Sequence, residues 1–184
     1  MNSVFIHPTA NVSESSLIGE GTKVWVNVQI RENAEIGNSC IISKDVYIDH
    51  GVKIGNHCKI QNSVSIYNGV TIEDDVFVGP NVAFTNDKVP RAFNTEWKIT
   101  PTLVEKGSSI GANSTVVCGV VIGSYSMIAA GSVVTKNVPK HALMMGNPSK
   151  VVGYVCECGH RLDYQNKCTV CGKITNINGS GEVI

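Results

Sequence analysis

The chain has 184 residues, with 15 lysine and arginine side chains balanced by 15 aspartate and glutamate side chains. That length suits one domain with a small appendage, and the zero net charge argues against a partner such as nucleic acid or an anionic membrane. Residues 1–12 have neither the basic nor the apolar region of a leader, and no window approaches about 18 apolar residues, so we expect no membrane insertion. We therefore expect a cytoplasmic protein whose seven cysteines are thiols or metal ligands.

From residue 6 to residue 84, an apolar side chain returns at every sixth position. The run has fourteen such positions, from Ile6 to Phe84, and all but the last hold isoleucine or valine. A helix would repeat apolar residues every three or four positions, and a half-buried strand every two. The position two before each aliphatic is mostly small or β-branched, and residues two apart in a strand face the same side. Each hexad therefore predicts a short strand with two inward side chains, followed by a corner.

Glycine and asparagine recur in the predicted corners. Both residue types tolerate left-handed backbone conformations, so we expect such conformations where they occur. The positions are Gly19, Gly37, Gly55, Gly79, Asn38, Asn56 and Asn68.

The repeat stops after Phe84 and resumes at Val104, from which it continues to Val134. The separation between Phe84 and Val104 is not a multiple of six, which indicates an inserted loop over 85–103. Loops of that length in a compact domain usually have a function.

A single hexad cannot bury its own apolar face, so the hexads are expected to stack into a parallel β-solenoid. Three hexads would complete one triangular coil, and the fourteen plus six hexads would give six to seven coils. The spacing does not define the hand of the winding, although right-handed crossovers are the general rule.

This run resembles the left-handed parallel β-helix of the hexapeptide-repeat acyltransferases, over about residues 6–155. The resemblance implies an all-β fold in residues 1–155, a homotrimer, and acetyl-CoA bound in the groove between neighbouring prisms. Residues 156–184 then form a separate cysteine-rich tail.

Three stretches are similar to the N-acetyltransferases of nucleotide-linked 3-amino sugars: "GVTIEDDVFVGPNVAFTNDKVPRA", "KGSSIGANSTVVCGVVIG" and "AAGSVVTKNVPKHALMMGNPSK". The resemblance implies acetylation of a UDP-linked 2-acetamido-3-amino-2,3-dideoxyglucuronate in surface-glycan biosynthesis. A dTDP-3-amino-6-deoxyhexose is the alternative substrate. The stretch "VWVNVQI" departs from the pattern, because relatives often carry histidines there.

Stacking at intervals of three hexads predicts a polar column along one edge of the prism. Its members are Glu14, Glu32, His50, Asn68 and Asn86. The resemblance places the asparagine of "FTND", Asn86, at the reacting amine, where its amide would orient the amine or the thioester carbonyl. His50 is the second candidate for catalysis, as a general base. Asn68 and Arg91 are candidates for substrate binding, the latter through phosphates or a sugar carboxylate.

The cofactor residues are expected after the inserted loop. Small residues would let pantetheine approach the backbone, and lysines would meet the phosphates of coenzyme A. The candidates are Gly111, Ala112, Ala129, Ala130, Lys136, Asn147, Pro148 and Lys150, of which three lie in "GNPSK".

The tail contains C-x-C-G and C-x-x-C-G, nine residues apart. Four thiolates fit a tetrahedral structural zinc site, and a tail of about thirty residues needs such a site because it is too short for a core of its own. The predicted ligands are Cys156, Cys158, Cys168 and Cys171, with His160 as a less favoured substitute. The second knuckle has no role in acetyl transfer, so the tail is also a candidate for docking another protein.

Two hypotheses of other classes stay open. A metal hydratase of the gamma carbonic anhydrase type would need three histidines, whereas only His50 and His57 lie in the middle of the prism. A non-catalytic hexapeptide-repeat scaffold would bind no coenzyme A.

Overall fold

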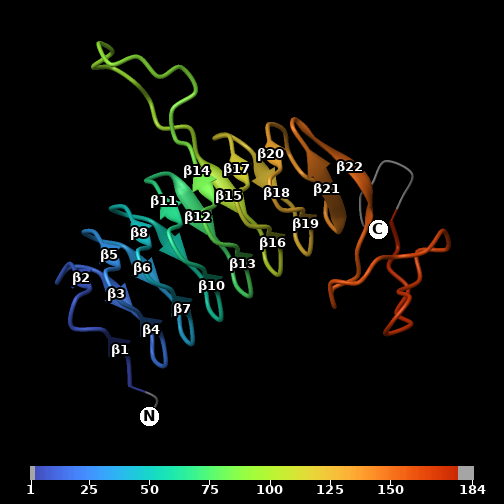
Figure 1. The fold of residues 1–184 in the computed structure, drawn as a ribbon, viewed down its shortest axis with the longest axis horizontal. Coiled ribbons are helices and arrows are strands. Elements are labelled where there is room, and N and C mark those ends of the chain that lie inside the picture. The colour runs from blue at the N-terminus through green and yellow to red at the C-terminus, as the bar shows by residue number, and fades with distance from the viewer. Residues whose placement is uncertain (1–2, 178–184) are drawn as a thin grey trace.

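The computed structural model describes residues 3–177. Within that range the chain forms 22 strands and no helix, so no helix there could cross a bilayer. The strands make three sheets that run side by side along one long prism, with β1 and β22 at opposite ends (Figure 1). The prediction of an all-β parallel solenoid is confirmed.

The three sheets are the faces of the prism. Sheet A contains β1 (Phe5–Ile6), β4 (Lys23–Val24), β7 (Ile41–Ile42), β10 (Lys59–Ile60), β13 (Phe77–Val78), β16 (Ser109–Ile110), β19 (Met127–Ile128), β21 (Ala142–Gly146) and β22 (Ser149–Tyr154). Sheet B contains β2 (Asn11–Val12), β5 (Gln29–Ile30), β8 (Tyr47–Ile48), β11 (Ser65–Ile66), β14 (Ala83–Phe84), β17 (Thr115–Val116) and β20 (Val133–Val134). Sheet C contains β3 (Leu17–Ile18), β6 (Glu35–Ile36), β9 (Lys53–Ile54), β12 (Val70–Ile72), β15 (Thr102–Val104) and β18 (Val121–Ile122).

Each regular strand pairs with the strand three further along the chain, in parallel register. Ile42 lies beside Ile60, for example, which is an offset of three hexads, as the repeat spacing predicts. Between β12 and β15 the offset is larger, since Val70 lies beside Thr102. The extra length forms the inserted loop, so the regular coils continue above it in the same parallel pairing.

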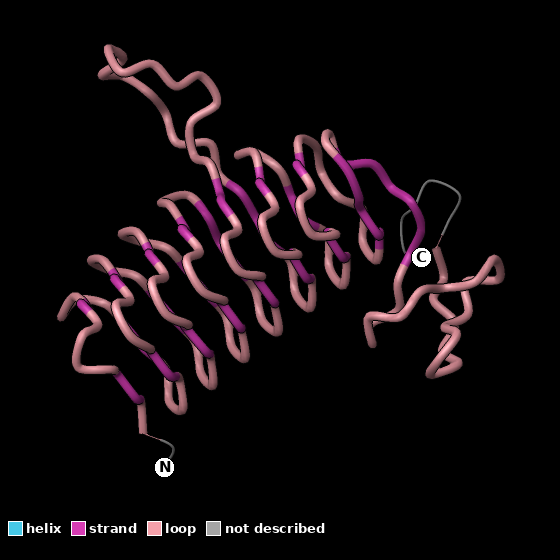
Figure 2. Tube along the Cα trace, viewed as in Figure 1, coloured by secondary structure: helices cyan, strands magenta, loops and turns pink. Residues whose placement is uncertain are grey.

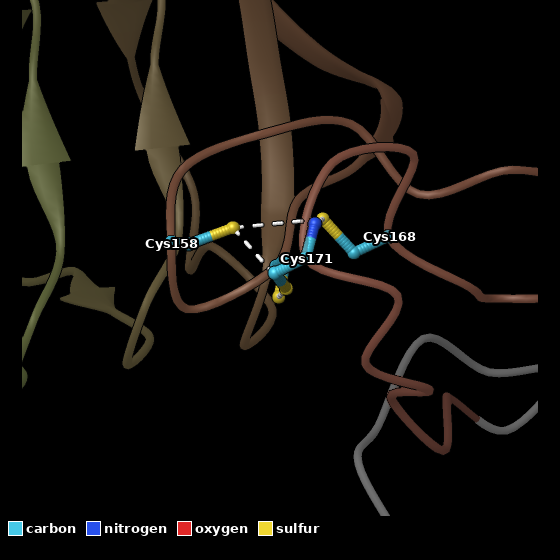
Figure 3. A group of neighbouring side chains, drawn as sticks. Cys158, Cys168 and Cys171 are labelled. Carbon is cyan, nitrogen blue, oxygen red and sulfur yellow. Dashed lines mark hydrogen bonds between the residues drawn. The ribbon is translucent and has the colours of Figure 1, made fainter.

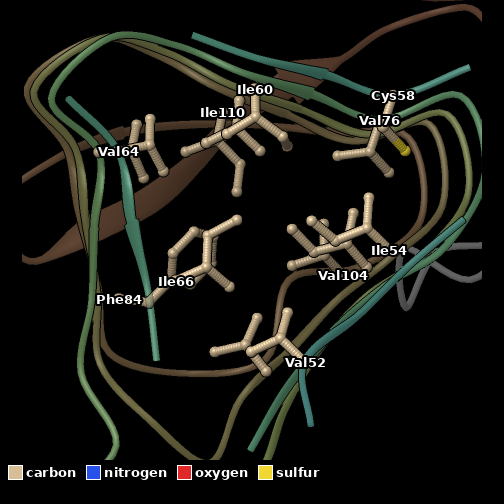
Figure 4. Packing of buried hydrophobic residues seen from close by; sticks show 14 of the residues in the cluster. Val52, Ile54, Cys58, Ile60, Val64, Ile66, Val76, Phe84, Val104 and Ile110 are labelled. Carbon is tan, nitrogen blue, oxygen red and sulfur yellow. The ribbon is translucent and has the colours of Figure 1, made fainter. Parts of the chain in front are cut away.

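The inner aliphatics form one continuous column of core side chains (Figure 4). From Val24 to Val134, every sixth-position aliphatic is at most 4 % exposed. The core begins only in the second coil: Ile6 is 44 % exposed because no coil lies beneath it. Cys40 and Cys58 face inward, and each thiol donates a hydrogen bond to a carbonyl of the next coil, that of Gly55 and that of Glu73, at 3.1 Å.

The corner glycines have a different role from the predicted one. From the second coil on, the left-handed residue of a regular corner lies three positions before the inner aliphatic, as at Asn27, where φ is 56°, and Gly131, where φ is 72°. None of the predicted positions adopts positive φ: the glycines lie directly after a strand, and the asparagines lie one residue further on. These positions are Gly19, Gly37, Gly55, Gly79, Asn38, Asn56 and Asn68. A Cβ atom on Gly55 would lie 2.6 Å from the backbone nitrogen of Asp74 in the next coil. Glycine is required there by the close approach of two coils.

The inserted loop projects from the prism as a long arm (Figure 2). It covers residues 85–101, because Thr102 and Leu103 already belong to β15. At its base the backbone amide of Thr100 donates to the carbonyl of Asn86 at 3.0 Å. The arm therefore leaves and rejoins the prism at one corner.

The two classes of glycine predict opposite responses to a side chain. In Gly55→Ala, the new Cβ meets the Asp74 backbone at 2.6 Å, so we expect the variant to lose about 2 kcal/mol or more of stability. Gly131 has a φ of 72° and no atom within 4 Å of an added Cβ, and Asn81 and Asn113 hold the equivalent position of other coils. Gly131→Asn should therefore change the stability by less than about 0.5 kcal/mol.

Urea unfolding followed by circular dichroism compares the two variants with the wild type. Equal effects of the two substitutions would contradict the distinction between a contact glycine and a left-handed glycine.

Candidate active site

Two corners of the prism carry the candidate site residues. Corner B/C consists of the turns that lead from sheet B to sheet C, and corner A/B consists of those that lead from sheet A to sheet B. His50, Asn68 and Asn86 lie at corner B/C, whereas Ala112 and Ala130 lie at corner A/B. The structure thus separates the predicted catalytic column from most of the predicted cofactor residues within one chain.

The column at corner B/C is stacked by hydrogen bonds between coils. The side-chain amide of Asn68 donates to the carbonyl of His50 at 2.7 Å, and the backbone amide of Gly51 donates to the carbonyl of Glu32 at 3.0 Å. Asn86 is half-buried at the top of this column, where the arm leaves the prism. The predicted register of these side chains is therefore present.

Asp49 organises the column, and the sequence reasoning missed it. Asp49 is only 8 % exposed, and its carboxylate accepts hydrogen bonds from Tyr47 Oη at 3.0 Å and from the His50 backbone amide at 2.9 Å. The backbone amide of Asn68 and the guanidinium of Arg31 also donate to it, at 3.2 and 3.3 Å. Arg31 lies one coil before Asp49, so the stacking rule that selected His50 would also have found this pair.

The same carboxylate orients the imidazole of His50. Its Nδ1 lies 3.1 Å from Asp49 Oδ1, which favours the tautomer that carries the proton on Nδ1 and leaves Nε2 as an acceptor. The His50 side chain is 52 % exposed, so a ligand can reach Nε2. Such a pair is the arrangement by which a carboxylate prepares a histidine to accept a proton.

The electrostatic state of Asp49 follows from its donors. Burial alone would raise the pKa of this carboxyl, but the amides of His50 and Asn68 together with the His50 ring and Tyr47 hydroxyl lower it below the ordinary 3.8. Asp49 is therefore ionised at neutral pH and remains an acceptor for the His50 ring.

Arg91 lies on the exposed arm, away from the column. Its guanidinium donates to the carbonyl of Pro90 at 2.8 Å, and its side chain faces solvent. Two aromatic side chains on the same arm are also uncovered: Phe93 is 84 % exposed and Trp97 is 44 % exposed. An arm with such side chains leaves apolar surface available for a partner.

Corner A/B offers backbone donors above the level of the arm. At some positions of the other corners the equivalent amide donates to a side chain one coil away, as Asn56 does to Asp74 at 2.6 Å and Cys118 does to Thr85 at 2.9 Å. Within residues 3–177, the amides of Ala112 and Ala130 have no such protein acceptor. These two N–H groups can therefore bind carbonyl oxygens of an extended ligand that lies along the corner.

The other predicted cofactor residues fall into three places. A Cβ atom on Gly111 would lie 2.8 Å from Cα of Ala130, so its small size serves the contact between coils, and Ala129 donates to the carbonyl of Met144 at 2.9 Å. Asn147, Pro148 and Lys150 lie in the hairpin of β21 and β22 at the end of sheet A. Lys136 instead follows β20, at corner B/C.

The four tail cysteines come together, as the sequence predicts, and Figure 3 shows three of them, Cys158, Cys168 and Cys171. All four Sγ atoms lie within 4.8 Å of one another, and Cys158 Sγ is 3.5 Å from Cys168 Sγ and 3.6 Å from Cys171 Sγ. The amide of Cys171 donates to Cys168 Sγ at 3.4 Å, and this bond together with the Val170 amide lowers the pKa of the Cys168 thiol to about 6. The set resembles the donor set of a tetrathiolate site.

Outside the tail, residues 3–177 hold no cluster of three histidine, cysteine or carboxylate side chains in reach of one ion. His57 pairs with Asp75 at 3.1 Å instead of approaching His50. A single chain thus offers no support for the metal-hydratase alternative.

The repeat pattern matches a known family. The family described as "Bacterial transferase hexapeptide (six repeats)" matches residues 33–68, 51–86 and 101–136. The chain is a hexapeptide-repeat protein. The matched residues include the coils that carry His50, Asn68 and Ala112, so both corners belong to the repeat.

One curated relative of this hexapeptide-repeat protein acts on an amino sugar. It is the dTDP-3-amino-3,6-dideoxy-alpha-D-galactopyranose 3-N-acetyltransferase of Aneurinibacillus thermoaerophilus, which is 51 % identical over 70 residues. That alignment covers 38 % of this chain and 36 % of the relative. The chain thus matches about a third of the length of this relative.

Two solved structures have the same fold with ligands. The perosamine N-acetyltransferase of Caulobacter crescentus, in complex with CoA and GDP-perosamine, is 27 % identical with a TM-score of 0.53, and the match covers 82 % of this chain and 57 % of that one. A hexapeptide-repeat acetyltransferase of Vibrio cholerae, in complex with acetyl coenzyme A, is 26 % identical with a TM-score of 0.52, covering 62 % and 70 %.

The environment of Asp49 predicts a pH-dependent contribution to stability. The pKa of this group is lower in the folded state than its ordinary 3.8, so the folded chain binds the proton more weakly than the unfolded chain. The stabilisation is therefore fully present above about pH 3.8 and is lost as the pH falls through the folded pKa. At pH 7, Asp49→Asn should cost about 2 kcal/mol or more, because it disturbs a set of buried donors.

Urea unfolding between pH 7 and pH 3 measures the gap in stability between this variant and the wild type. We expect a constant gap down to pH 5 and a smaller gap below pH 3.8. The control is Asp45→Asn, whose exposed carboxylate bonds Lys44 at 3.2 Å and should show a smaller gap throughout. A gap that does not change with pH would mean that the charge of Asp49 is not what stabilises the fold.

Proposed function

We propose that this hexapeptide-repeat protein is an acetyl-CoA-dependent N-acetyltransferase that acts on the 3-amino group of a nucleotide-linked sugar in surface-glycan biosynthesis. The observation that carries the proposal is the pair of columns at two corners: polar side chains end at Asn86 on corner B/C, and the amides of Ala112 and Ala130, which have no protein acceptor within residues 3–177, lie one and two coils higher on corner A/B. The amino-sugar acetyltransferases among the similar proteins support the reaction class.

Acetyl transfer to an amine requires a neutral amine beside the thioester carbonyl, a donor for the developing oxyanion and an acceptor for the proton. Acetyl-CoA supplies the acetyl group as a thioester. The amine nitrogen forms a bond to the carbonyl carbon, the carbon–sulfur bond breaks, and the amine proton passes to a base or to the leaving thiolate. We assign the side-chain amide of Asn86 to the orientation of the amine or the donation of an N–H to the oxyanion.

The height of His50 suggests a second role along the same substrate. His50 lies two coils below Asn86, roughly 10 Å at the spacing of neighbouring strands, so one amine cannot touch both side chains. A sugar diphosphate can span that distance, with Asn68 between its ends. If the amine instead lies at the level of His50, His50 is the general base. Its Nε2 then accepts the amine proton, and Asp49 positions the ring.

We infer that the enzyme is a homotrimer, with left-handed winding as in the acyltransferases that it resembles. A threefold assembly brings corner B/C of one copy beside corner A/B of the next, which is how two columns that one chain keeps apart can form one site. The arm supports this arrangement, because Phe93 and Trp97 need a surface to cover them. In the trimer Lys136 would lie with the neighbour's coenzyme, and Arg91 would approach the phosphates or a sugar carboxylate of the substrate.

The nucleotide is part of the proposal. The relative that is 51 % identical acts on a dTDP-linked 3-amino sugar, which supports the dTDP-linked substrate over the UDP-linked glucuronate that the sequence favours.

The deciding experiment incubates the protein with acetyl-CoA and dTDP-, UDP- and GDP-linked 3- and 4-amino sugars, and measures the release of free thiol. We expect release with a 3-amino sugar; binding of coenzyme A without transfer to any member would contradict the proposal, and no binding of coenzyme A would favour the scaffold alternative.

We place the cysteine-rich tail outside the transfer reaction and assign its four thiols to one structural zinc ion. A partner protein for the tail remains a prediction of the sequence.

Asn86→Ala should lower turnover about 100-fold or more, the scale expected for loss of one oxyanion donor. Binding of coenzyme A, measured by calorimetry, should barely change, because its predicted contacts lie after the arm. Asn86→Asp should not restore turnover if the side chain acts as an N–H donor. Asn11→Ala, on the outer face of β2, is the matched control and should keep full activity. If Asn86→Ala kept full turnover with an intact oligomer, Asn86 would not be the catalytic residue, and His50 would be the remaining candidate.

Mixed trimers test whether the site is shared. Asn86→Ala damages corner B/C, and Ala130→Trp damages corner A/B; each variant alone should be nearly inactive. When the two are unfolded and refolded together in equal amounts, about a quarter of the interfaces should combine two undamaged corners and regain activity. No recovery in confirmed mixed trimers, or light scattering that shows an active monomer, would contradict a shared site.

A further inference from the structure

The two ends of the solenoid are closed differently. At the N-terminal end, Phe5 is 42 % exposed and Ile6 is 44 % exposed, so the first coil is open to solvent. At the other end the last aliphatics are covered: Ile128 is 1 % exposed and Val134 is fully buried. A stack of repeats needs a terminal unit of this kind, because its last apolar face has no further coil above it.

The covering unit includes the start of the tail. Val155 donates its amide to the carbonyl of His141 at 2.8 Å, and its own carbonyl lies 2.9 Å from Nδ1 of His141. The His141 ring is buried and stacks on Tyr125 at a centroid distance of 5.4 Å. Val155 and Cys156 are each 1 % exposed, so the chain returns to the prism at this point.

The tail has almost no apolar core that would keep it in this position. Tyr164 is 92 % exposed, Val170 is 66 % exposed and Ile174 is 62 % exposed. In residues 156–177 the buried side chains are those of Cys156, Cys168 and Thr175, at 1 %, 2 % and 7 % exposure, and none of them is a large apolar side chain. The tail must therefore gain its stability from a link between its cysteines.

The backbone around the cysteines is built as two matching turns. Gly159 and Gly172 follow the second cysteine of each pair and adopt φ angles of 85° and 74°. The amide of Gly159 donates to the carbonyl of Cys156, and that of Gly172 donates to the carbonyl of Cys168, at 2.8 and 3.1 Å. Both pairs thus direct two sulfur atoms toward one point, as in a zinc knuckle.

We propose that the four cysteines bind one zinc ion and that the zinc-bound tail is the cap that closes the C-terminal end of the solenoid. The Sγ distances of 3.5 to 3.6 Å that join Cys158 to Cys168, Cys158 to Cys171 and Cys156 to Cys171 are close to the edge of a tetrahedron with zinc–sulfur bonds of about 2.3 Å, which is about 3.8 Å. They are far longer than a disulfide bond of about 2.05 Å. The ion cross-links the cysteines of the tail, and the hydrogen bonds between Val155 and His141 join the tail to the end of the solenoid.

Because zinc would bind only the folded tail, its removal should loosen the segment that the tail covers. We expect one zinc per chain in the full-length protein, with no visible absorption. The double variant Cys168→Ser/Cys171→Ser should lose the zinc, and amide hydrogen exchange at residues 141–156 should become at least about 10-fold faster. Exchange in residues 41–84 should stay unchanged.

Two further measurements distinguish loss of the zinc-bound cap from a general folding defect. His160→Ala is the matched control, since His160 Nδ1 lies 3.6 Å from Cys158 Sγ but is not needed for four-sulfur binding; this variant should keep both the zinc and the protection. In the wild type, chelation should speed exchange at 141–156, and added zinc should restore the slow exchange. These readouts do not depend on acetyl transfer.

Several results would overturn the proposal. They are a metal-free protein with disulfide-bonded cysteines, a coloured iron tetrathiolate in place of zinc, and release of zinc that leaves exchange at 141–156 unchanged.

Discussion

The structure depends on one constraint: each strand forms its backbone hydrogen bonds with the strand three hexads further along the chain. The amide of Ile41 donates to the carbonyl of Cys58 at 2.9 Å, and the same offset recurs from coil to coil. Isoleucines one coil apart then lie directly above one another, as Ile42 and Ile60 do, and both are fully buried. A residue inserted or lost within a coil would move every later aliphatic out of this column, so long insertions are tolerated only as loops that leave and rejoin one corner, as at Asn86 and Thr100.

The same constraint places polar groups at fixed heights. A corner residue cannot contribute to the core, so it is available for chemistry, and its neighbours are the residues one coil before and one coil after it. Asp49 shows what this allows, since it accepts hydrogen bonds from Arg31 one coil below, Tyr47 on the preceding strand and Asn68 one coil above. The constraint also keeps the columns at corners A/B and B/C apart within one chain, which is why the proposed site needs a second copy.

The sequence predicts the coils well because their signal is strictly periodic and does not depend on distant contacts. It also predicts the register of His50, Asn68 and Asn86, since stacking follows from the spacing. It fails where the cause lies between coils: the type of residue at Gly55 suggests a left-handed turn, whereas the approach of Asp74 is the actual reason for glycine. The spacing also does not show which corner Lys136 occupies: it lies at corner B/C, apart from Ala112 and Ala130, so its predicted contact with the coenzyme needs a neighbouring copy.

We propose that one acetyl-transfer site forms between corner B/C of one copy and corner A/B of another. A crystal structure of the protein with coenzyme A and a nucleotide-linked 3-amino sugar tests it most directly. We expect the pantetheine to accept hydrogen bonds from the amides of Ala112 and Ala130 of one copy, and its sulfur to lie beside the sugar amine and Asn86 of the next. Coenzyme A bound wholly within one chain, or a sulfur out of contact with the amine held at Asn86, would contradict it.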